Sequence, residues 1–293
     1  MKAFPSRGYI DIRSVSMPSL AKGRWPNEVR SDEVEDKEMK MTGIYLSGTG
    51  NTKHCLEKLL WMVDSAAALV PIENNKEAIE KINTNDVIYL AYPTQFSNVP
   101  YMVKDFIQKN KELWQGKKVF CMTTMGLFSG DGTGCAARLL KKYGAVIIGG
   151  LQVKMPDAVS DSKMLKKSFE ENQRIIKEAD IRLEEAAKEI RKGNYPKEGL
   201  SFFAHMAGLF GQRLWFYGKT KGYSKKLKIS DVCTGCGLCA KNCPMGNLSI
   251  KNGKAVSADK CAMCYRCISS CPKQAITLLG KQVVEQCRYE KFV

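Results

Sequence analysis

Two cysteine runs near the end of the chain have a spacing that suits metal chemistry. The first run, CTGCGLCAKNCP, begins at Cys233, and the second, CAMCYRCISSCP, begins at Cys261. In each run three cysteines stand at intervals of three, a fourth follows four residues later, and a proline comes next. Three thiolates at this spacing wrap a tight loop around three corners of a cubic iron–sulfur cluster. The repeat therefore predicts two 4Fe–4S clusters.

The fourth cysteine of each run lies too far along the chain to complete its own cluster, so we expect each run to lend it to the other. On this assignment the ligands of the first cluster are Cys233, Cys236, Cys239 and Cys271. The ligands of the second cluster are Cys261, Cys264, Cys267 and Cys243. Gly235 and Gly237 leave room for backbone N–H groups to approach the cluster sulfurs, which helps to set the reduction potential.

Zinc is the alternative metal for these cysteines. Structural zinc sites take four Cys or His ligands, usually as two spaced pairs. Two triplets with reciprocal single cysteines, and no histidine nearby, fit that pattern badly. Of the other cysteines, Cys55, Cys121 and Cys135 are expected to be small buried hydrophobic residues, and Cys287 is expected to have no ligand role.

The turn LSGTGNT, residues 46–52, is a second candidate site because it separates an expected strand from an expected helix. Backbone N–H groups and the helix dipole favour an anion at such a turn. The turn lacks the Gly-Lys-Ser/Thr ending of a triphosphate loop and the third glycine of a dinucleotide fingerprint. The hydroxyls of Ser47, Thr49 and Thr52, with backbone N–H groups, suit the single terminal phosphate of FMN. Gly50 and Asn51 complete the candidate residues of this turn. The alternative is a turn that only closes a strand–helix unit.

Two further loops, YPTQFSNVP at 92–100 and TTMGLFSGDG at 123–132, follow the third and fourth expected strands. Ligands of an open α/β sheet bind beyond the carboxyl ends of its strands. Phe96 and Phe128 could lie against a flavin ring, or they could cap the core. The other candidate cofactor residues of these loops are Pro93, Thr94, Gln95, Thr124, Gly126, Gly130 and Asp131.

The elements that must position these residues alternate between strand and helix from residue 41 to about 194. Strands are expected at 41–47, 66–73, 86–93, 117–124 and 145–153, where short apolar runs are rich in β-branched residues. Helices are expected at 52–63, 100–112, 132–143 and 161–192. This order predicts an α/β doubly wound domain with a five-stranded parallel sheet covered on both faces.

The rest of the chain divides by composition. Residues 1–40 lack a sustained periodicity of apolar residues and are expected to be a mobile extension. Residues 41–194 are expected to form the α/β domain. Residues 195–230 form an aromatic and lysine-rich linker, expected to be a helix that packs on or between domains. The alternative is a docking surface for a partner or a membrane surface. Residues 231–293 are expected to form a small α+β domain in which a hairpin follows each cysteine run.

The net charge and the length of the longest apolar stretch limit the possible partners. Residues 194–293 hold 16 Lys and Arg against 5 Asp and Glu, a net +11. The excess favours acidic redox partner proteins, or offsets the charge of thiolates and iron. No nucleic-acid-binding motif accompanies it, so nucleic acid is not expected. The longest apolar stretch is too short to span a bilayer, so no transmembrane segment is expected. Without a secretory signal, the cysteine usage favours a reducing, cytoplasmic location.

On these motifs, residues 41–193 resemble a flavodoxin-like domain, and residues 225–280 resemble a bacterial two-cluster 4Fe–4S ferredoxin. The whole chain is similar to the flavodoxin–ferredoxin fusion electron carriers of anaerobic bacteria and archaea. The resemblance implies sheet order 2-1-3-4-5.

The resemblance also implies FMN as a cofactor, held on loops 47–52, 92–98 and 123–131. The sequence departs from the family pattern in one loop. Short flavodoxins usually stack a Tyr or Trp on the flavin from the third of these loops, where this chain offers only Phe128.

The expected function is electron transfer, with single electrons carried on two 4Fe–4S clusters and exchanged with FMN. The sequence shows no general base, nucleophile or triad, so we expect a carrier rather than an enzyme. One alternative is a flavin-dependent reductase of a small substrate, such as a quinone, that is fed by the clusters. The other is a flavin-free redox or partner-binding module.

Overall fold

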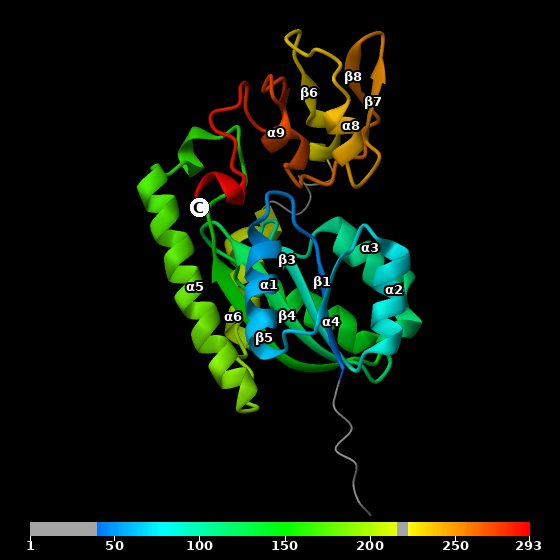
Figure 1. Cartoon of the computed structure of the whole chain (residues 1–293), viewed down its shortest axis with the longest axis vertical. Helices are drawn as coiled ribbons and strands as arrows, with labels where there is room; N and C mark the ends of the chain where they lie inside the picture. Colours follow the sequence, from blue (N-terminus) through cyan, green and yellow to red (C-terminus); the bar gives the residue numbers. More distant parts are fainter. Residues whose placement is uncertain (1–39, 216–221) are drawn as a thin grey trace, which may run out of the picture. The chain divides into compact units, whose positions relative to one another are not determined.

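A computed structural model describes residues 40–215 and 222–293 (Figure 1). The extension expected at residues 1–40 therefore lies almost entirely outside the described residues. The described residues fall within one compact unit. The expected domain boundaries after residues 194 and 230 fall within this unit and stay predictions.

The described chain contains a parallel five-stranded sheet of order β2-β1-β3-β4-β5 (Figure 1). Its strands are β1 (Met41–Tyr45), β2 (Ala68–Pro71), β3 (Val87–Pro93), β4 (Lys118–Met125) and β5 (Val146–Lys154). Each strand overlaps one of the five predicted runs, and the order is the one that the resemblance implied, so both predictions are confirmed. Six of the seven residues of β3 are buried, because helices cover both faces of the sheet.

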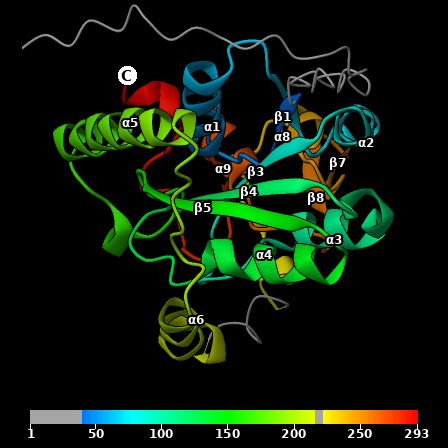
Figure 2. The same cartoon turned by 90° about the horizontal axis from the view of Figure 1, so that it is seen from below.

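Helices α1 (Asn51–Val63) and α5 (Phe169–Arg191) lie on one face of the sheet, and α3 (Tyr101–Lys109) and α4 (Gly132–Lys142) lie on the other (Figure 2). Each face has its own cluster of buried apolar side chains. Helix α2 (Asn75–Thr84) was not predicted. It buries only Ala78 and Ile82, so apolar residues recur too rarely in its sequence to show the periodicity of a helix.

Helix α5 begins later than predicted, at Phe169 instead of residue 161. The Oγ atom of Ser168 accepts a hydrogen bond from the backbone N–H of Glu171 at 3.1 Å, which caps the helix at this point. The segment before the cap is irregular apart from a 3₁₀ turn at Lys163–Leu165.

Asp161, in that irregular segment, ties the α/β domain to the end of the second cysteine repeat. Its side chain is buried. Its Oδ2 atom accepts backbone N–H groups from Leu278, Leu279 and Gly280 at 2.6, 2.9 and 3.1 Å. Its Oδ1 atom accepts the hydroxyl of Tyr265 at 3.0 Å. A buried carboxylate with four donors is fully satisfied, so this contact fixes where the C-terminal segment lies.

The C-terminal part contains two antiparallel strand pairs, β7 (Leu248–Lys251) with β8 (Lys254–Ser257), and β6 (Lys228–Ile229) with β9 (Ile276–Thr277). Between β7 and β8, Asn252 and Gly253 both have positive φ, 48° and 72°. A type I′ two-residue hairpin turn requires this, and β7 pairs with β8 on either side of it, so the hairpin predicted after the first run is confirmed.

The hairpin predicted after the second cysteine run is wrong. Strand β9 pairs instead with β6, which precedes the first run. The pairing joins the two ends of the repeat, so β9 has its hydrogen-bonding partner outside its own half. The short helices of this part are α8 (Leu238–Asn242) and α9 (Arg266–Ser270).

Helix α6 (Phe202–Gly208) continues into a π-helical turn at Leu209–Arg213 and contacts α4. The remaining short elements are 3₁₀ turns at Lys111–Trp114, Ser224–Lys226 and Tyr289–Lys291. Within the described residues, no helix combines the length and the apolar character that crossing a bilayer requires.

Candidate iron–sulfur and flavin sites

The cysteines predicted to hold the first cluster surround one small cavity. Three come from the first run and one from the second, and they are Cys233, Cys236, Cys239 and Cys271. Leu238, Ile250 and Ile276 supply apolar walls. Helix α8 starts after Gly237, whose φ of 79° lies in the left-handed region that favours glycine.

The cysteines predicted to hold the second cluster surround another small cavity. Three come from the second run and one from the first, and they are Cys243, Cys261, Cys264 and Cys267. Its other lining residues include Leu227, Leu248 and Ile268. The two cavities thus divide the eight cysteines in the reciprocal way that the spacing predicted.

Backbone N–H groups point at sulfur atoms in both sets of cysteines. The four contacts measure 3.3–3.4 Å and run from Ala255 to Cys233, from Asn247 to Cys243, from Met263 to Cys261 and from Ala275 to Cys271. The N–H groups of Ala255 and Gly235 lower the pKa of Cys233. Such donors stabilise thiolate, the form that binds iron, and they tune the reduction potential of a cluster.

Burial has the opposite effect on the inner thiols. It raises the pKa of Cys264 to about 11. Burial also raises the pKa of Cys267, and the neighbouring thiols of Cys264, Cys261 and Cys243 raise it further. Crowded thiolates in an apolar cavity need a compensating positive charge, which iron supplies. This donor chemistry fits an iron–sulfur cluster.

In residues 40–215 and 222–293, no three Cys, His, Asp or Glu side chains converge tightly enough to hold one ion. A structural zinc site needs four such ligands at about 2.0–2.3 Å from the metal.

The turn at 47–52 connects β1 to α1. Gly50 precedes the helix with a φ of 97°, a conformation that an L side chain rarely adopts. The hydroxyls of Thr52 and Thr124 are 2.8 Å apart, so the turn touches the predicted loop that follows β4. The side chain of Asn51 donates to the carbonyl of Pro156 at 2.8 Å.

Two buried polar atoms of this turn, Ser47 Oγ and Asn51 Oδ1, have no hydrogen-bond partner among the described residues. Buried polar atoms are normally paired. Unpaired atoms at the amino end of a 13-residue helix fit a bound phosphate and its neighbouring hydroxyls. The residues present therefore suit the phosphate end of FMN.

The loop of the second cysteine run lies directly on this turn. A Cβ atom on Gly48 would overlap the backbone carbonyl oxygen of Cys264. The guanidinium of Arg266 donates to the carbonyl oxygen of Ser47 at 2.7 Å and also pairs with Glu73. These contacts place the second set of cysteines next to the turn.

The end of the chain adds a contact to the same turn. The backbone N–H of Tyr289 donates to the carbonyl of Thr49 at 2.8 Å. The ring of Tyr289 stacks on His54 of α1, with ring centroids 4.2 Å apart. The turn is thus held from two sides by the C-terminal part of the chain.

The loop after β3 also faces the second cysteine run. The side chain of Gln95 donates to the carbonyls of Ala262 and Met263 at 3.0 and 3.2 Å. Phe96 has a positive φ of 51°, and its ring stacks near that of Tyr223 with centroids 6.1 Å apart. Pro93 ends β3, and the N–H of Thr94 donates to the carbonyl of Thr124 at 2.9 Å.

A cavity of about 620 Å³ opens beside this loop. Its walls include Phe96, Lys104, Lys260, Cys261 and Met263. It therefore adjoins a predicted cluster ligand and one of the two predicted flavin phenylalanines.

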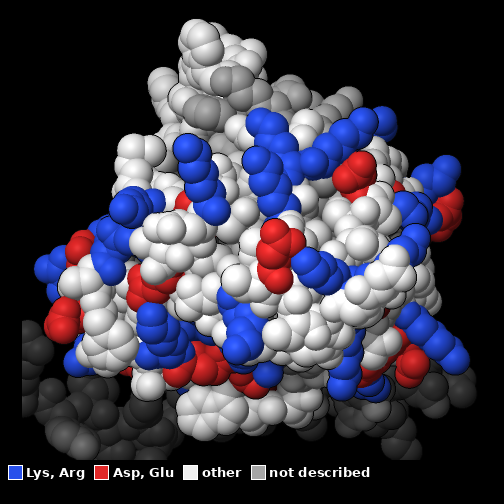
Figure 3. Space-filling view, turned by 90° about the horizontal axis from the view of Figure 1, so that it is seen from above, with Lys and Arg blue, Asp and Glu red and all other residues white. Residues whose placement is uncertain are grey.

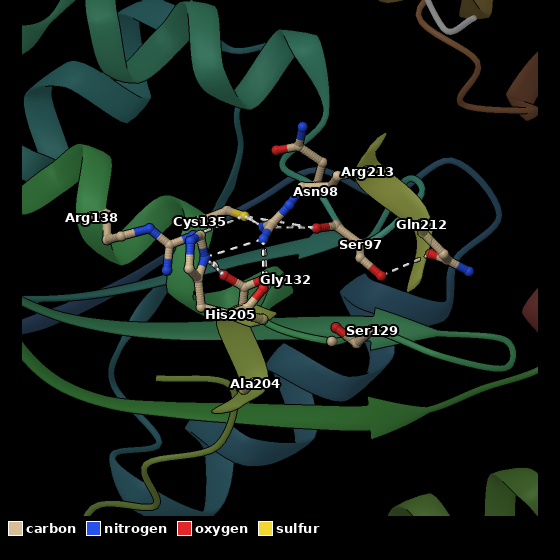
Figure 4. A network of polar contacts seen from close by, with 12 residues as sticks. Ser97, Asn98, Ser129, Gly132, Cys135, Arg138, Ala204, His205, Gln212 and Arg213 are labelled. Carbon is tan, nitrogen blue, oxygen red and sulfur yellow. Dashed lines mark hydrogen bonds and ion pairs between the residues drawn. The ribbon is translucent and has the colours of Figure 1, made fainter. Parts of the chain in front are cut away.

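The loop after β4 is anchored by the side chain of Asp131. Asp131 is fully buried, and its carboxylate is paired with three cationic or polar side chains, Arg138, His205 and Arg213. Figure 4 shows Arg138, His205 and Arg213 pointing toward one another. Phe128 is exposed and lies close to Gly211 of the π-helical turn. Neither contact tests a role in binding FMN, so both residues stay predictions.

Gly126 and Gly130 both sit at close approaches. A Cβ atom on Gly126 would overlap the carboxylate of Asp157, and one on Gly130 would meet the backbone of Gly208. The glycines are therefore explained at least in part by protein contacts. Cys55 and Cys121 are fully buried as predicted, whereas Cys135 is partly exposed beside Arg213.

Sequence reasoning missed Arg266, Asp161 and Arg213. Arg266 lies between Cys264 and Cys267. A charged residue inside a cysteine run is a sequence signal that could have predicted a contact with another part of the chain. Asp161 and Arg213 act on segments more than 80 residues away, and no local pattern indicates such partners.

Comparison with known families agrees with this geometry. Residues 44–173 match the model of a flavodoxin domain, and residues 232–275 match that of a 4Fe–4S dicluster domain. No match was found among curated proteins.

Several solved structures are similar to part of the chain. The flavodoxin of Megasphaera elsdenii, in its two-electron reduced form, is 25% identical, with 40% of this chain and 88% of that chain covered and a TM-score of 0.35. The flavodoxin of Fusobacterium nucleatum bound to flavin mononucleotide is 19% identical, with 53% and 98% covered and a TM-score of 0.37. A flavodoxin from the domain Archaea is 18% identical, with 51% and 99% covered and a TM-score of 0.36.

The dicluster match supports the predicted 4Fe–4S clusters, and the flavodoxin match supports FMN. Both domain types indicate electron transfer. The chain carries a flavodoxin domain at residues 44–173, followed by a 4Fe–4S dicluster domain at residues 232–275.

Proposed function

We propose that the protein carries single electrons on two 4Fe–4S clusters and exchanges them with FMN on its flavodoxin domain. The observation that carries this proposal is the contact between the second cysteine run and the phosphate turn. Gly48 abuts the carbonyl of Cys264, and Gln95 bonds to the carbonyl of Met263. A cluster held by this run and a flavin held by the turn would be neighbours.

Each cluster takes its ligands from both runs in this proposal. Cys233, Cys236, Cys239 and Cys271 hold the first cluster. Cys261, Cys264, Cys267 and Cys243 hold the second. The reciprocal lining of the two cavities supports both assignments.

The phosphate turn holds FMN in this proposal. The hydroxyl of Ser47 and the backbone N–H groups of the turn would donate to the phosphate, and Asn51 Oδ1 would accept a hydroxyl of the ribityl chain. Bound FMN supplies a centre that takes up electrons one or two at a time. Arg266, fixed by Glu73, holds the turn in place from the side of the second cysteine run.

An external partner can approach the first set of cysteines at Cys236. Cys236 is exposed, whereas Cys264 lies behind Gly48. Lys251, Lys254 and Lys273 are exposed in the same domain. In the upper half of Figure 3, Lys and Arg side chains outnumber Asp and Glu side chains, whereas the lower half carries both. These charges favour an acidic redox partner protein, which they would steer toward the chain.

The test is the cofactor content of full-length protein purified without oxygen and reconstituted with iron and sulfide. The proposal predicts about eight irons, about eight sulfides and one FMN per chain. About four irons or fewer after full reconstitution would contradict the two-cluster assignment. Eight irons without flavin would leave the flavin-free redox or partner-binding module as the function.

A second candidate is the reductase of a small substrate such as a quinone. The observation that favours it is the cavity of about 620 Å³ beside Cys261, which is lined by apolar Phe96 and Met263 and by the cations Lys104 and Lys260. Reduced protein would then turn over a soluble quinone, and Val99→Trp, which fills the cavity, would abolish turnover while the cluster absorbance stays. If reduced wild-type protein does not turn over a quinone, the reductase function is excluded and the electron-carrier function remains.

A further inference from the structure

Helix α6 and its π-helical continuation, residues 202–215, have their apolar side turned outward. A surface helix of a globular protein normally turns its apolar stripe to the core. Here five large apolar side chains are exposed, and they are Phe202 (70%), Phe203 (82%), Phe210 (57%), Leu214 (60%) and Trp215 (69%). We call these five side chains the aromatic face.

The inward side of the helix is polar and tightly bound. Arg213 is buried and donates to Asp131 at 2.6 Å, and His205 lies 2.9 Å from the other oxygen of the same carboxylate. The hydroxyl of Ser97 donates to the side chain of Gln212 at 2.8 Å. Figure 4 shows His205, Gln212 and Arg213 all directed toward the flavodoxin domain.

The π-helical turn serves this orientation. It brings Gly208 and Arg213, five residues apart, to the same side of the helix. Gly208 allows the close approach to Gly130. Removing Asp131 would leave the buried charge of Arg213 without a carboxylate partner, so this pair locks the helix with its aromatic face outward.

Neighbouring side chains enlarge the aromatic face. Leu127 and Phe128, in the loop after β4, are also exposed, and the Phe128 ring approaches Gly211. A soluble domain rarely exposes several large apolar side chains together unless they bind something. The aromatic face therefore needs an occupant.

The charges around the aromatic face indicate the occupant. Residues 199–215 and 222–230 contain no Asp or Glu, and Lys225, Lys226 and Lys228 are exposed. Tyr223, next to these lysines, stacks near Phe96, and the adjacent Ser97 holds Gln212. The lysines and the helix are therefore anchored on one loop.

We infer that the aromatic face docks this protein on a membrane surface that contains anionic lipid. Phe, Leu and Trp on one side of a helix, beside lysines and without acidic groups, suit the interface between acyl chains and anionic headgroups. A second copy of the chain is a poorer occupant, because a two-fold interface would bring the same lysines face to face. The inference goes beyond the proposed electron transfer and does not depend on it.

The test is flotation of the full-length protein with vesicles of phosphatidylcholine alone and of about three parts phosphatidylcholine to one part phosphatidylglycerol. The protein should float with the anionic vesicles and remain behind with the neutral ones. The triple variant Phe203→Ser, Phe210→Ser and Trp215→Ser should lower binding at least about tenfold. The double variant Lys225→Glu and Lys226→Glu should lower it as well.

Matched controls use exposed residues elsewhere. The control for the aromatic variant is Trp61→Ser, Tyr101→Ser and Met164→Ser together, which removes comparable exposed apolar surface. The control for the lysine variant is Lys76→Glu with Lys177→Glu, which changes the net charge by the same amount. Both controls should bind like the wild type. Thermal unfolding of every variant confirms that each is folded, which is expected because the changed side chains are exposed.

Three results would overturn the inference. The first is no binding to anionic vesicles. The second is binding that the lysine variant reduces but the aromatic variant leaves unchanged, which would indicate nonspecific attraction of a basic protein. The third is a wild-type dimer that the aromatic variant converts to monomer without any vesicle binding, which would make a second copy the occupant.

A spectroscopic readout separates contact from simple folding effects. Trp215 fluorescence should shift to the blue when anionic vesicles are added, because the indole leaves water. The shift should disappear in Trp215→Phe, which keeps an aromatic ring, and persist in Trp61→Phe. A shift that persists in Trp215→Phe would contradict the proposed contact.

Discussion

Each small cavity of the C-terminal domain draws three sulfurs from one cysteine run and one from the other. The reason is local geometry: three cysteines at intervals of three fit one loop, and the fourth follows a short helix that turns it away. Helices α8 and α9 end directly before Cys243 and Cys271. Such an exchange makes each cluster depend on both halves of the repeat.

This exchange predicts the effect of Cys271→Ser. The variant lies in the second run, yet it should damage the cluster held mainly by the first run and leave the other intact. Iron content should fall toward half after mild oxidation, and the remaining cluster should keep its electron paramagnetic resonance signal. Cys287→Ser, the matched control, should keep all the iron, because Cys287 lies outside both cavities. Loss of the second-run cluster alone in Cys271→Ser would refute the assignment.

The sequence led to the two cysteine sets that line the cavities because their spacing along the chain is itself the signal, and the role of the turn residues stays a prediction. It did not predict how the long loops are used. Asp131 was expected near the flavin, and the structure pairs it with Arg213, 82 residues away. Gln95 bonds to carbonyls 167 and 168 residues away. Side-chain partners at such separations depend on tertiary packing, which no local pattern encodes.

The contact between elements that matters most joins the turn after β1 to the loop before α9. Glycine at position 48 permits it, since a Cβ atom would overlap the Cys264 carbonyl. Arg266, the first residue of α9, reaches back to Ser47 and Glu73. Backbone packing and a partly buried ion pair thus hold the two elements together.

Gly48→Ala tests this contact. The added methyl group forces the turn and the loop apart and should lower the free energy of unfolding by about 1–3 kcal/mol. Reduction of the flavin by the clusters should also become slower, because their separation increases. Denaturant unfolding and rapid mixing measure the two effects. Gly222→Ala, where a Cβ atom meets nothing within 4 Å, should change neither. Wild-type stability in Gly48→Ala would show that the contact is not formed.

Elements with strong local patterns were predicted, and elements that depend on distant partners were not. The five strands are short apolar runs that read clearly from the sequence. Helix α2 buries too few residues to show a period, and α5 starts at its Ser168 cap rather than where helical composition begins. Strand β9 pairs with a segment on the far side of the repeat, so its expected hairpin could not form.

At the scale of the whole molecule, the described contacts join a flavodoxin domain to a dicluster domain at the turn between β1 and α1. Asp161, Arg266 and Tyr289 each bridge the two parts. The first set of cysteines thus has an exposed member, Cys236, and the second set lies against the turn. In the proposed function, this placement of the two cysteine sets suits an electron path from a partner protein to the flavodoxin domain.

The most direct test of this account is an anaerobic reductive titration of the reconstituted full-length protein, followed by visible absorbance. Two clusters that each accept one electron and one flavin that accepts two predict about four reducing equivalents per chain. The absorbance should show both cluster and flavin bleaching within one titration. Uptake of about two equivalents, with either the cluster or the flavin absorbance missing, would contradict the account.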